Sequence, residues 1–280
     1  MELGKINTLK VLRESDIAYV LTDGLVEVFL HKKEAKKPYL DGEDIDVFLY
    51  SDNQGRVTAS TKEPLIQLNE VKMLEVVSVN ERYGAFLYYG MVKDLLLSLD
   101  DLPNDSRDWP KPGDFVMVEM INKKDHLYGH IIGRKQITDH FPDAYKIADN
   151  ETVEANVMYL IDNGLVCFTK DGHEIFIHKN NYRERYHIGQ LVKPKILKQN
   201  PSDEYVGTLI EQKEIMLEKD ALRILDYLER NNGIMKYTDK SNAEEIQQVF
   251  HMSKSAFKRA LGSLYRAKKV ILNKENTKKI

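Results

Sequence analysis

The sequence predicts a mainly β chain in which three small barrels follow one another and a small mixed α+β domain comes last. Short runs rich in Val, Ile, Phe and Tyr alternate with turn residues up to about residue 212, which is typical of short strands. The hexapeptide at residues 27–32 recurs almost unchanged at residues 174–179, which indicates an internal repeat. Beyond residue 213, leucines recur at helical spacing.

The expected elements follow from these patterns in chain order. We expect strands at residues 17–21, 25–30, 46–50, 73–79, 85–89, 115–121, 153–160 and 174–178. We expect helices at residues 221–232, 243–250 and 255–268, and two short strands within residues 270–280. Asn231-Asn232-Gly233 is a stop signal for the first helix, and Ser253 is the expected N-cap of the last one.

The internal repeat extends beyond the two matching hexapeptides. A weaker middle copy occupies residues 94–99, with Ser98 at the position that His31 and His178 hold in the other copies. Twelve residues before each of these three positions lies a residue inside an apolar strand, namely Tyr19, Phe86 and Val166. A glycine that opens a further strand follows each copy, at Gly42, Gly113 and Gly189. Three β units of similar layout are therefore expected.

Alternation within these strands assigns side chains to two faces, because successive residues of a strand point to opposite sides of the sheet. Val28 and Leu30 are expected to fill the first core, which places Phe29 and His31 on the outside. In the last copy the same argument places Phe176 and His178 outside. Single-stranded bases stack on such aromatics, although an outward aromatic can instead pack against a neighbouring domain.

Residues 82–87, 95–98 and 111–118 together resemble an S1 RNA-binding domain. This resemblance implies a five-stranded OB-type barrel whose exposed face carries aromatics, a histidine at the end of the third strand, and an Asp and an Arg near the last hairpin. Matched position by position, it implies RNA contacts in the first copy from Tyr19, His31, Asp52 and Arg56. It implies contacts in the second copy from Tyr83 and Phe86, and in the third from Phe176 and His178, with Phe168 in place of the missing aromatic at Val166.

The C-terminal part resembles a winged helix, with residues 251–261 at the position of its turn and recognition helix. The predicted domains are therefore S1-like OB-fold barrels at residues 1–62, 63–143 and 144–212, followed by a winged helix at residues 213–280. Their order is similar to that of the conserved virulence factor B group of bacterial RNA-binding proteins. This resemblance implies a non-catalytic regulator of gene expression that acts after transcription, in a virulence-type role.

The charge is divided unevenly between these domains. The net charge of the whole chain is −3, but residues 213–280 hold 15 Lys and Arg against 9 Asp and Glu. We expect the basic side chains around the last helix to hold phosphates, whereas the alternative is a solvated helix face. These residues are Lys254, Lys258, Arg259, Arg266, Lys268 and Lys269, and Lys179 is the basic candidate in the third copy.

Other chemistry is not indicated by the sequence. The only cysteine is Cys167, and the histidines lack the Cys partners and spacing of a metal site, so we expect no bound metal. The acidic run that contains Asp100 and Asp101 lies in a Pro-rich loop, and no glycine-rich nucleotide-binding loop is present. We therefore expect no catalytic residue and no cofactor.

The remaining expectations concern partner and location. One cysteine suits a reducing cytoplasm, and no run of 18 apolar residues or apolar leader is present, so we expect a cytoplasmic protein without a membrane partner. No dimerisation helix is evident, so we expect a monomer. Single-stranded RNA is the expected partner. The alternatives are a winged-helix transcription regulator that binds DNA and, less favoured because a carboxylate cluster is missing, a hydrolase such as a ribonuclease.

Overall fold

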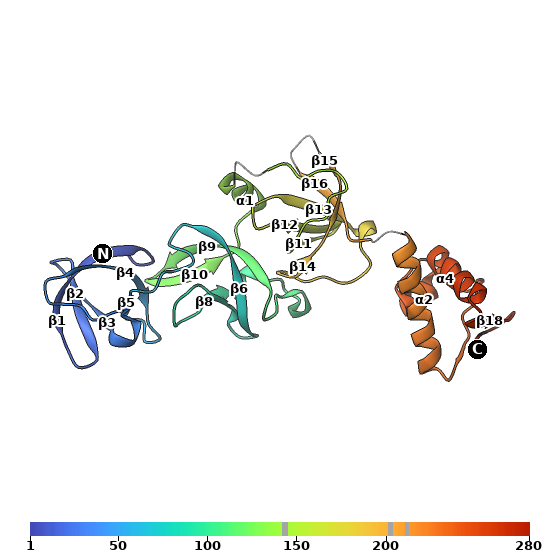
Figure 1. The fold of residues 1–280 in the computed structure, drawn as a ribbon, viewed down its shortest axis with the longest axis horizontal. Helices are drawn as coiled ribbons and strands as arrows, with labels where there is room; N and C mark the ends of the chain where they lie inside the picture. The colour runs from blue at the N-terminus through green and yellow to red at the C-terminus, as the bar shows by residue number, and fades with distance from the viewer. Residues whose placement is uncertain (142–144, 201–203, 211–212) are drawn as a thin grey trace. The chain divides into compact units, whose positions relative to one another are not determined.

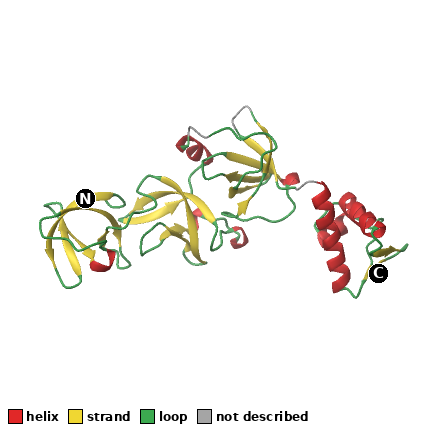
Figure 2. Cartoon of the chain, viewed as in Figure 1, coloured by secondary structure: helices red, strands yellow, loops and turns green. Residues whose placement is uncertain are grey.

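The computed structural model describes residues 1–141, 145–200, 204–210 and 213–280 (Figure 1). Strands dominate up to residue 208, and most of the helical residues lie in the C-terminal part (Figure 2). The predicted mainly β class with a C-terminal winged helix is therefore confirmed. By compactness the chain forms two units, residues 1–176 with 186–205 and residues 177–185 with 206–280.

The first barrel is closed by five strands in the order β1-β2-β3-β5-β4. Its strands are β1 (Ile6–Glu14), β2 (Ala18–Thr22), β3 (Glu27–His31), β4 (Asp44–Ser51) and β5 (Val57–Ser60), with the 3₁₀ turn η1 (Lys32–Glu34) after β3. Alternation along β3 holds, because Val28 and Leu30 are buried and Phe29 is exposed. The core joins these side chains to Leu9, Leu21 and Leu49.

The second barrel repeats this arrangement in the order β10-β8-β7-β6-β9. Its strands are β6 (Val71–Asn80), β7 (Gly84–Tyr88), β8 (Leu95–Ser98), β9 (Phe115–Lys123) and β10 (His126–His130), with the 3₁₀ turns η2 (Leu99–Asp101) and η3 (Ser106–Asp108). Ala85, Leu87 and Leu97 fill its core and are fully buried. The residues that alternate with these, Phe86 on β7 and Leu96 on β8, therefore point outward.

The third β unit is an open six-stranded sheet in the order β14-β11-β12-β13-β16-β15. Its strands are β11 (Ala155–Ile161), β12 (Gly164–Phe168), β13 (Glu174–His178), β14 (Leu191–Val192), β15 (Lys195–Gln199) and β16 (Tyr205–Thr208). The counterpart of β4 and β9, which close the other two barrels, is divided here into β14 and β15. Pro194 lies between them and has no N–H to donate to a ladder. Pairing resumes beyond it as an isolated bridge between Thr152 and Lys195.

One local backbone feature recurs in all three β units and supports the internal repeat that the sequence predicts. The first strand of each unit has a β-bulge opposite the second strand, at residues 11–13, 76–78 and 157–159. The glycine before the fourth strand donates its N–H to the carbonyl at the start of each bulge, from Gly42 to Val11, Gly113 to Val76 and Gly189 to Val157, at 2.7–2.8 Å. These glycines have φ between +82° and +92°, which side chains with a Cβ rarely adopt.

The C-terminal helices are α2 (Lys213–Arg230), α3 (Ala243–Phe250) and α4 (Lys254–Arg266), beside a three-stranded sheet of β17 (Ile234–Met235), β19 (Thr277–Lys279) and β18 (Val270–Leu272). Ile246, Phe257 and Leu261 are buried in the core that joins the helices. The predicted cap is confirmed, because Ser253 Oγ accepts a hydrogen bond from the N–H of Ala256 at 3.2 Å. None of the helices in the described residues is long and apolar enough to cross a membrane.

The predicted domain boundaries at 143/144 and 212/213 fall on residues 142–144 and 211–212, which lie outside the described residues. The first barrel lies within predicted domain 1–62 and the second within 63–143. The two compact units do not follow the predicted boundaries, because residues 177–185 group with the C-terminal part. The four-domain division therefore stays a prediction.

Helix α1 (Arg134–His140) is anchored to the third unit by a charged pair. Arg134 donates to the buried Glu174 and forms a second ion pair of 2.6 Å with Glu204. Burial raises the pKa of Glu174, and Arg134 opposes that rise. The pair therefore holds α1, and with it Ile137, against the third sheet.

Replacing Arg134 by Ala should destabilise the protein in a pH-dependent way. Without Arg134 the pKa of Glu174 rises further above its unfolded value, so stability falls as pH increases above about 4.3. We expect a loss of about 1–3 kcal/mol at neutral pH, because the arginine is partly exposed, and a smaller loss at acid pH. Urea denaturation at several pH values checks this, with the exposed neighbour Lys135→Ala as control. A pH-independent loss would contradict it.

Candidate functional site

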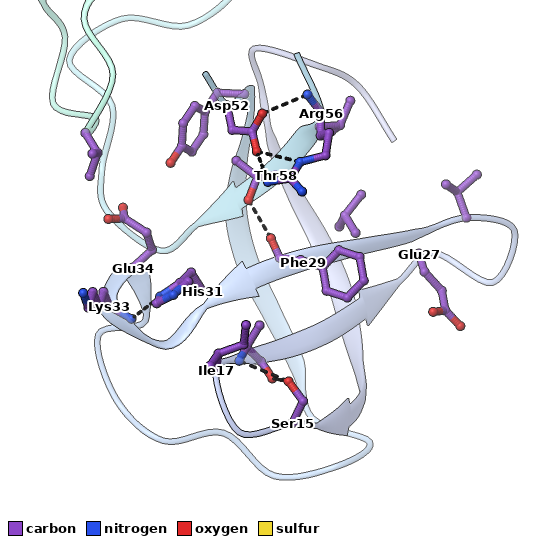
Figure 3. Close-up of a pocket in the computed structure, with 16 residues that line it drawn as sticks. Ser15, Ile17, Glu27, Phe29, His31, Lys33, Glu34, Asp52, Arg56 and Thr58 are labelled. Carbon is purple, nitrogen blue, oxygen red and sulfur yellow. Dashed lines mark hydrogen bonds and ion pairs between the residues drawn. The ribbon is translucent and has the colours of Figure 1, made fainter. Parts of the chain in front are cut away.

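A groove of about 770 Å³ lies on the outer face of the first barrel (Figure 3). Phe29 and His31 from β3 line it together with Asp52 and Arg56 from the β4–β5 turn. The sequence predicted all four of these residues as site residues, and the structure brings them together. Phe29 is 55% exposed, and four other exposed apolar side chains line the same groove, namely Ile17, Val26, Val57 and Val92.

Asp52 and Arg56 form a pre-organised pair at the mouth of the groove. Arg56 donates from Nε and Nη2 to Asp52 Oδ2 at 2.9 and 2.7 Å, and the backbone N–H groups of Gln54 and Arg56 donate to Oδ1. Partial burial works against ionisation, but these bonds outweigh it and lower the pKa of Asp52. The carboxylate therefore stays ionised and fixes an exposed guanidinium, the group best suited to phosphate and to base edges.

His31 has a structural role in addition to its place in the groove. Its Nδ1 accepts a hydrogen bond from the N–H of Lys33 at 3.1 Å and caps the 3₁₀ turn η1 (Figure 3). This bond requires the proton of the neutral ring to be on Nε2, which can donate to a ligand. His178 caps η4 (Lys179–Asn181) in the same way, and Ser98 caps η2 through its hydroxyl. The cap explains why serine can replace histidine at this position.

The expected outward position of Tyr19 is wrong. Tyr19 is 4% exposed and packs edge-on against Tyr39 in the first core, with ring centroids 5.7 Å apart. The β2–β3 hairpin is one residue shorter than the β7–β8 hairpin, because His31 pairs with Ala18 whereas Ser98 pairs with Gly84. A one-residue shift moves a side chain to the other face of a strand, so Val20 holds the position of Phe86.

The second barrel presents a row of side chains across three strands of its outer face. Phe86 on β7 pairs with Leu96 on β8, and Leu96 pairs with Tyr128 on β10. All three side chains are half-buried. Tyr83 is 51% exposed in the β6–β7 turn, with the Arg82 guanidinium 5.5 Å from its ring centroid. The predicted positions of Tyr83 and Phe86 are therefore accessible.

The outer face of the third unit is covered. Phe168 is fully buried in a cluster with Val166, with Met117 of the second barrel and with Ile137 of α1. The prediction that Phe168 lies on an open face is therefore wrong, because long-range packing covers that part of β12. Phe176 is partly buried against the same cluster, so the neighbouring-domain alternative applies to this copy.

The basic candidates lie on the second compact unit. All six residues predicted around α4 are exposed, whereas Phe257, Leu261 and Leu264 on the opposite stripe are buried, as a helix with one apolar face requires. The six are Lys254, Lys258, Arg259, Arg266, Lys268 and Lys269. Lys179 is exposed and His178 is partly buried.

Several groove residues were missed by the sequence analysis. Ile17, Val57 and Val92 are exposed apolar side chains that line the same groove as Phe29, and Tyr128 completes the row of the second barrel. The alternation of β5 and β10 was the available signal, but neither strand was predicted. Among residues 1–141, 145–200, 204–210 and 213–280, no three His, Cys, Asp or Glu side chains gather as a metal site would require.

Three family models match separate parts of the chain. The S1 domain model matches residues 3–62, the model of the CvfB first S1-like domain matches residues 72–130, and the CvfB-like winged helix domain model matches residues 222–278. The first two matches coincide with the two closed barrels, and the third contains α3 and α4.

Similar proteins extend over most of the chain. The uncharacterized protein YitL of Bacillus subtilis is 33% identical over 272 residues, which cover 96% of this chain and 91% of YitL. Conserved virulence factor B of Staphylococcus aureus is 30% identical over 239 residues, covering 85% and 79%. A crystal structure from Streptococcus pneumoniae, described as a multidomain protein with nucleic acid binding domains, aligns with a TM-score of 0.64 at 27% identity over 99% of this chain and 98% of that one.

Truncation of Phe168 and of Phe29 should affect stability very differently. Phe168→Ala removes a fully buried ring and should lower the free energy of unfolding by about 3–5 kcal/mol. Phe29→Ala removes an exposed ring and should cost less than about 1 kcal/mol. Urea denaturation of both variants checks the contrast. Equal losses would contradict the placement of the two faces.

Proposed function

We propose that this chain, which belongs to the conserved virulence factor B family, binds single-stranded RNA as a non-catalytic regulator that acts after transcription. We further propose that it acts as a monomer in the cytoplasm. The observation that carries the proposal is the groove of the first barrel, where an exposed aromatic ring lies beside a histidine and a fixed arginine.

The chemistry of the groove favours an unpaired base over a duplex. The Phe29 ring offers a stacking platform, and its apolar neighbours exclude water from a stacked base. His31 can donate from Nε2, and the Arg56 guanidinium, held by Asp52, faces the same space. A base reaches such a platform only when it is unstacked and unpaired, which favours single-stranded RNA.

The exposed basic side chains around α4 support a second contribution. Lysines and arginines that neutralise phosphates release counterions, and this adds affinity without reading sequence. The same exposed helix favours the alternative function, a transcription regulator whose recognition helix enters the major groove of DNA. The two functions differ in whether the first barrel contributes to affinity.

A binding titration distinguishes them. The intact protein is titrated with an unstructured single-stranded RNA of about 12 nucleotides, the matching RNA duplex and the matching DNA duplex. We expect the single strand to bind most tightly. Phe29→Ala should weaken its binding by about 1–3 kcal/mol, or roughly 5- to 150-fold, because a stacking contact is lost. Leu40→Ala is the control, since Leu40 is 78% exposed in the same barrel but does not line the groove.

Lys258→Ala should act differently. It removes one phosphate contact, so it should reduce the slope of log affinity against log salt by about 0.7 for a single strand, without changing which nucleic acid is preferred. Tighter binding of duplex DNA than of single-stranded RNA, together with no effect of Phe29→Ala, would favour the DNA-binding alternative and overturn the proposal.

A further inference from the structure

The hairpin that carries Asp52 and Arg56 rests directly against the second barrel. Ser51 Oγ donates to the carbonyl of Asp125 at 2.6 Å, and Lys93 Nζ donates to the carbonyls of Ser51 and Asp52 at 3.2 and 3.1 Å. A Cβ placed on Gly55 would lie 3.4 Å from Cε1 of His126. The mouth of the first groove and the β9–β10 hairpin are therefore adjacent, and both belong to the same compact unit.

A second groove begins on the other side of this contact. It has a volume of about 590 Å³, and its lining residues come from β8, η2 and the β9–β10 hairpin: Ser98, Asp100, Asp101, Lys123, Lys124, His126 and Tyr128. Lys123, Lys124 and His126 are exposed, and Tyr128 belongs to the row that also contains Leu96 and Phe86. The groove thus brings Lys123, Lys124 and His126 to the same lining as Tyr128, with Asp100 and Asp101 among the other lining residues.

The two-residue loop at the edge of this groove is held in a strained conformation. Lys124 and Asp125 have φ of +52° and +61°, a region in which Gly and Asn are favoured. The hydrogen bond from Ser51 of the first barrel holds the carbonyl of Asp125 in place. Strain of this kind persists where the surrounding structure fixes it, often at binding sites. Here the turn presents Lys124 in the lining of the second groove.

We propose that an RNA strand bound in the first groove continues past Gly55 into the second groove. On this path, Lys124 and His126 contact phosphates and Tyr128 stacks a base. The proposal rests on the proposed function and adds to it a second binding site and a path for the strand between the two grooves. The two grooves together form one continuous site, which a short oligonucleotide fills only in part.

The loop itself supplies a matched pair of variants. Lys124→Gly and Asp125→Gly each place glycine at a positive φ, so both relieve strain and both should preserve the fold. They change the charge in opposite directions, because one removes a cation and the other an anion. Thermal denaturation should show neither variant less stable than the parent protein. Any difference in RNA affinity between them then reports charge at the second groove.

Affinity is measured for single-stranded oligouridylates of about 4 and about 16 nucleotides, which span the site sizes of OB folds. With the long RNA we expect Lys124→Gly to weaken binding several-fold and to reduce the salt slope by about 0.7, and Asp125→Gly to leave binding equal or tighter. Tyr128→Ala should weaken binding of the long RNA at least 5-fold. With the short RNA, which fills the first groove, none of the three should matter.

The outcomes separate this inference from the function on which it rests. If Phe29→Ala weakens both RNAs but Lys124→Gly and Asp125→Gly act alike on the long one, the continuous path is wrong and the proposed function stands. If Lys124→Gly weakens the short RNA as much as the long one, the path is also wrong, because the second groove is then a primary site. If Phe29→Ala affects neither RNA, the proposed function fails first.

Discussion

Each β unit depends on the pairing register between its first and second strands. In every unit a glycine with positive φ donates to the carbonyl at the start of the bulge in the first strand, for example from Gly113 to Val76. The bulge determines which residues of the second strand face the core. A shift of one residue therefore decides whether an aromatic fills the core, as Tyr19 does, or faces outward, as Phe86 does.

Local patterns in the sequence were sufficient for most of the fold and for two residues of the first groove. The repeated hexapeptide placed Phe29 and His31 correctly, because alternation along β3 depends only on neighbouring residues. Ser253 was recognised as a helix cap for the same reason. The strand break at Pro194 was not anticipated, although proline in a closing strand was an available signal.

The errors have long-range causes. The burial of Tyr19 follows from a hairpin one residue shorter than its counterpart, a difference that appears only when strand partners are known. Phe168 is covered by Met117, which lies about 50 residues earlier in the chain, on the second barrel. The second groove lies beside the close approach of Gly55 to His126, which belong to different barrels. No periodicity within a strand reports such contacts.

The three copies of one β unit therefore have different outer faces. The first unit carries a groove. The second carries a row of apolar and aromatic side chains beside a hairpin with two lysines, and the outer face of the third is buried against its neighbour. The most direct test is cross-linking of 4-thiouridine RNA to the intact protein, with the linked residues identified by mass spectrometry. The account predicts cross-links at Phe29 and on the second barrel at Tyr128, and none at Phe168. Cross-links at Phe168 with none at Phe29 would contradict it.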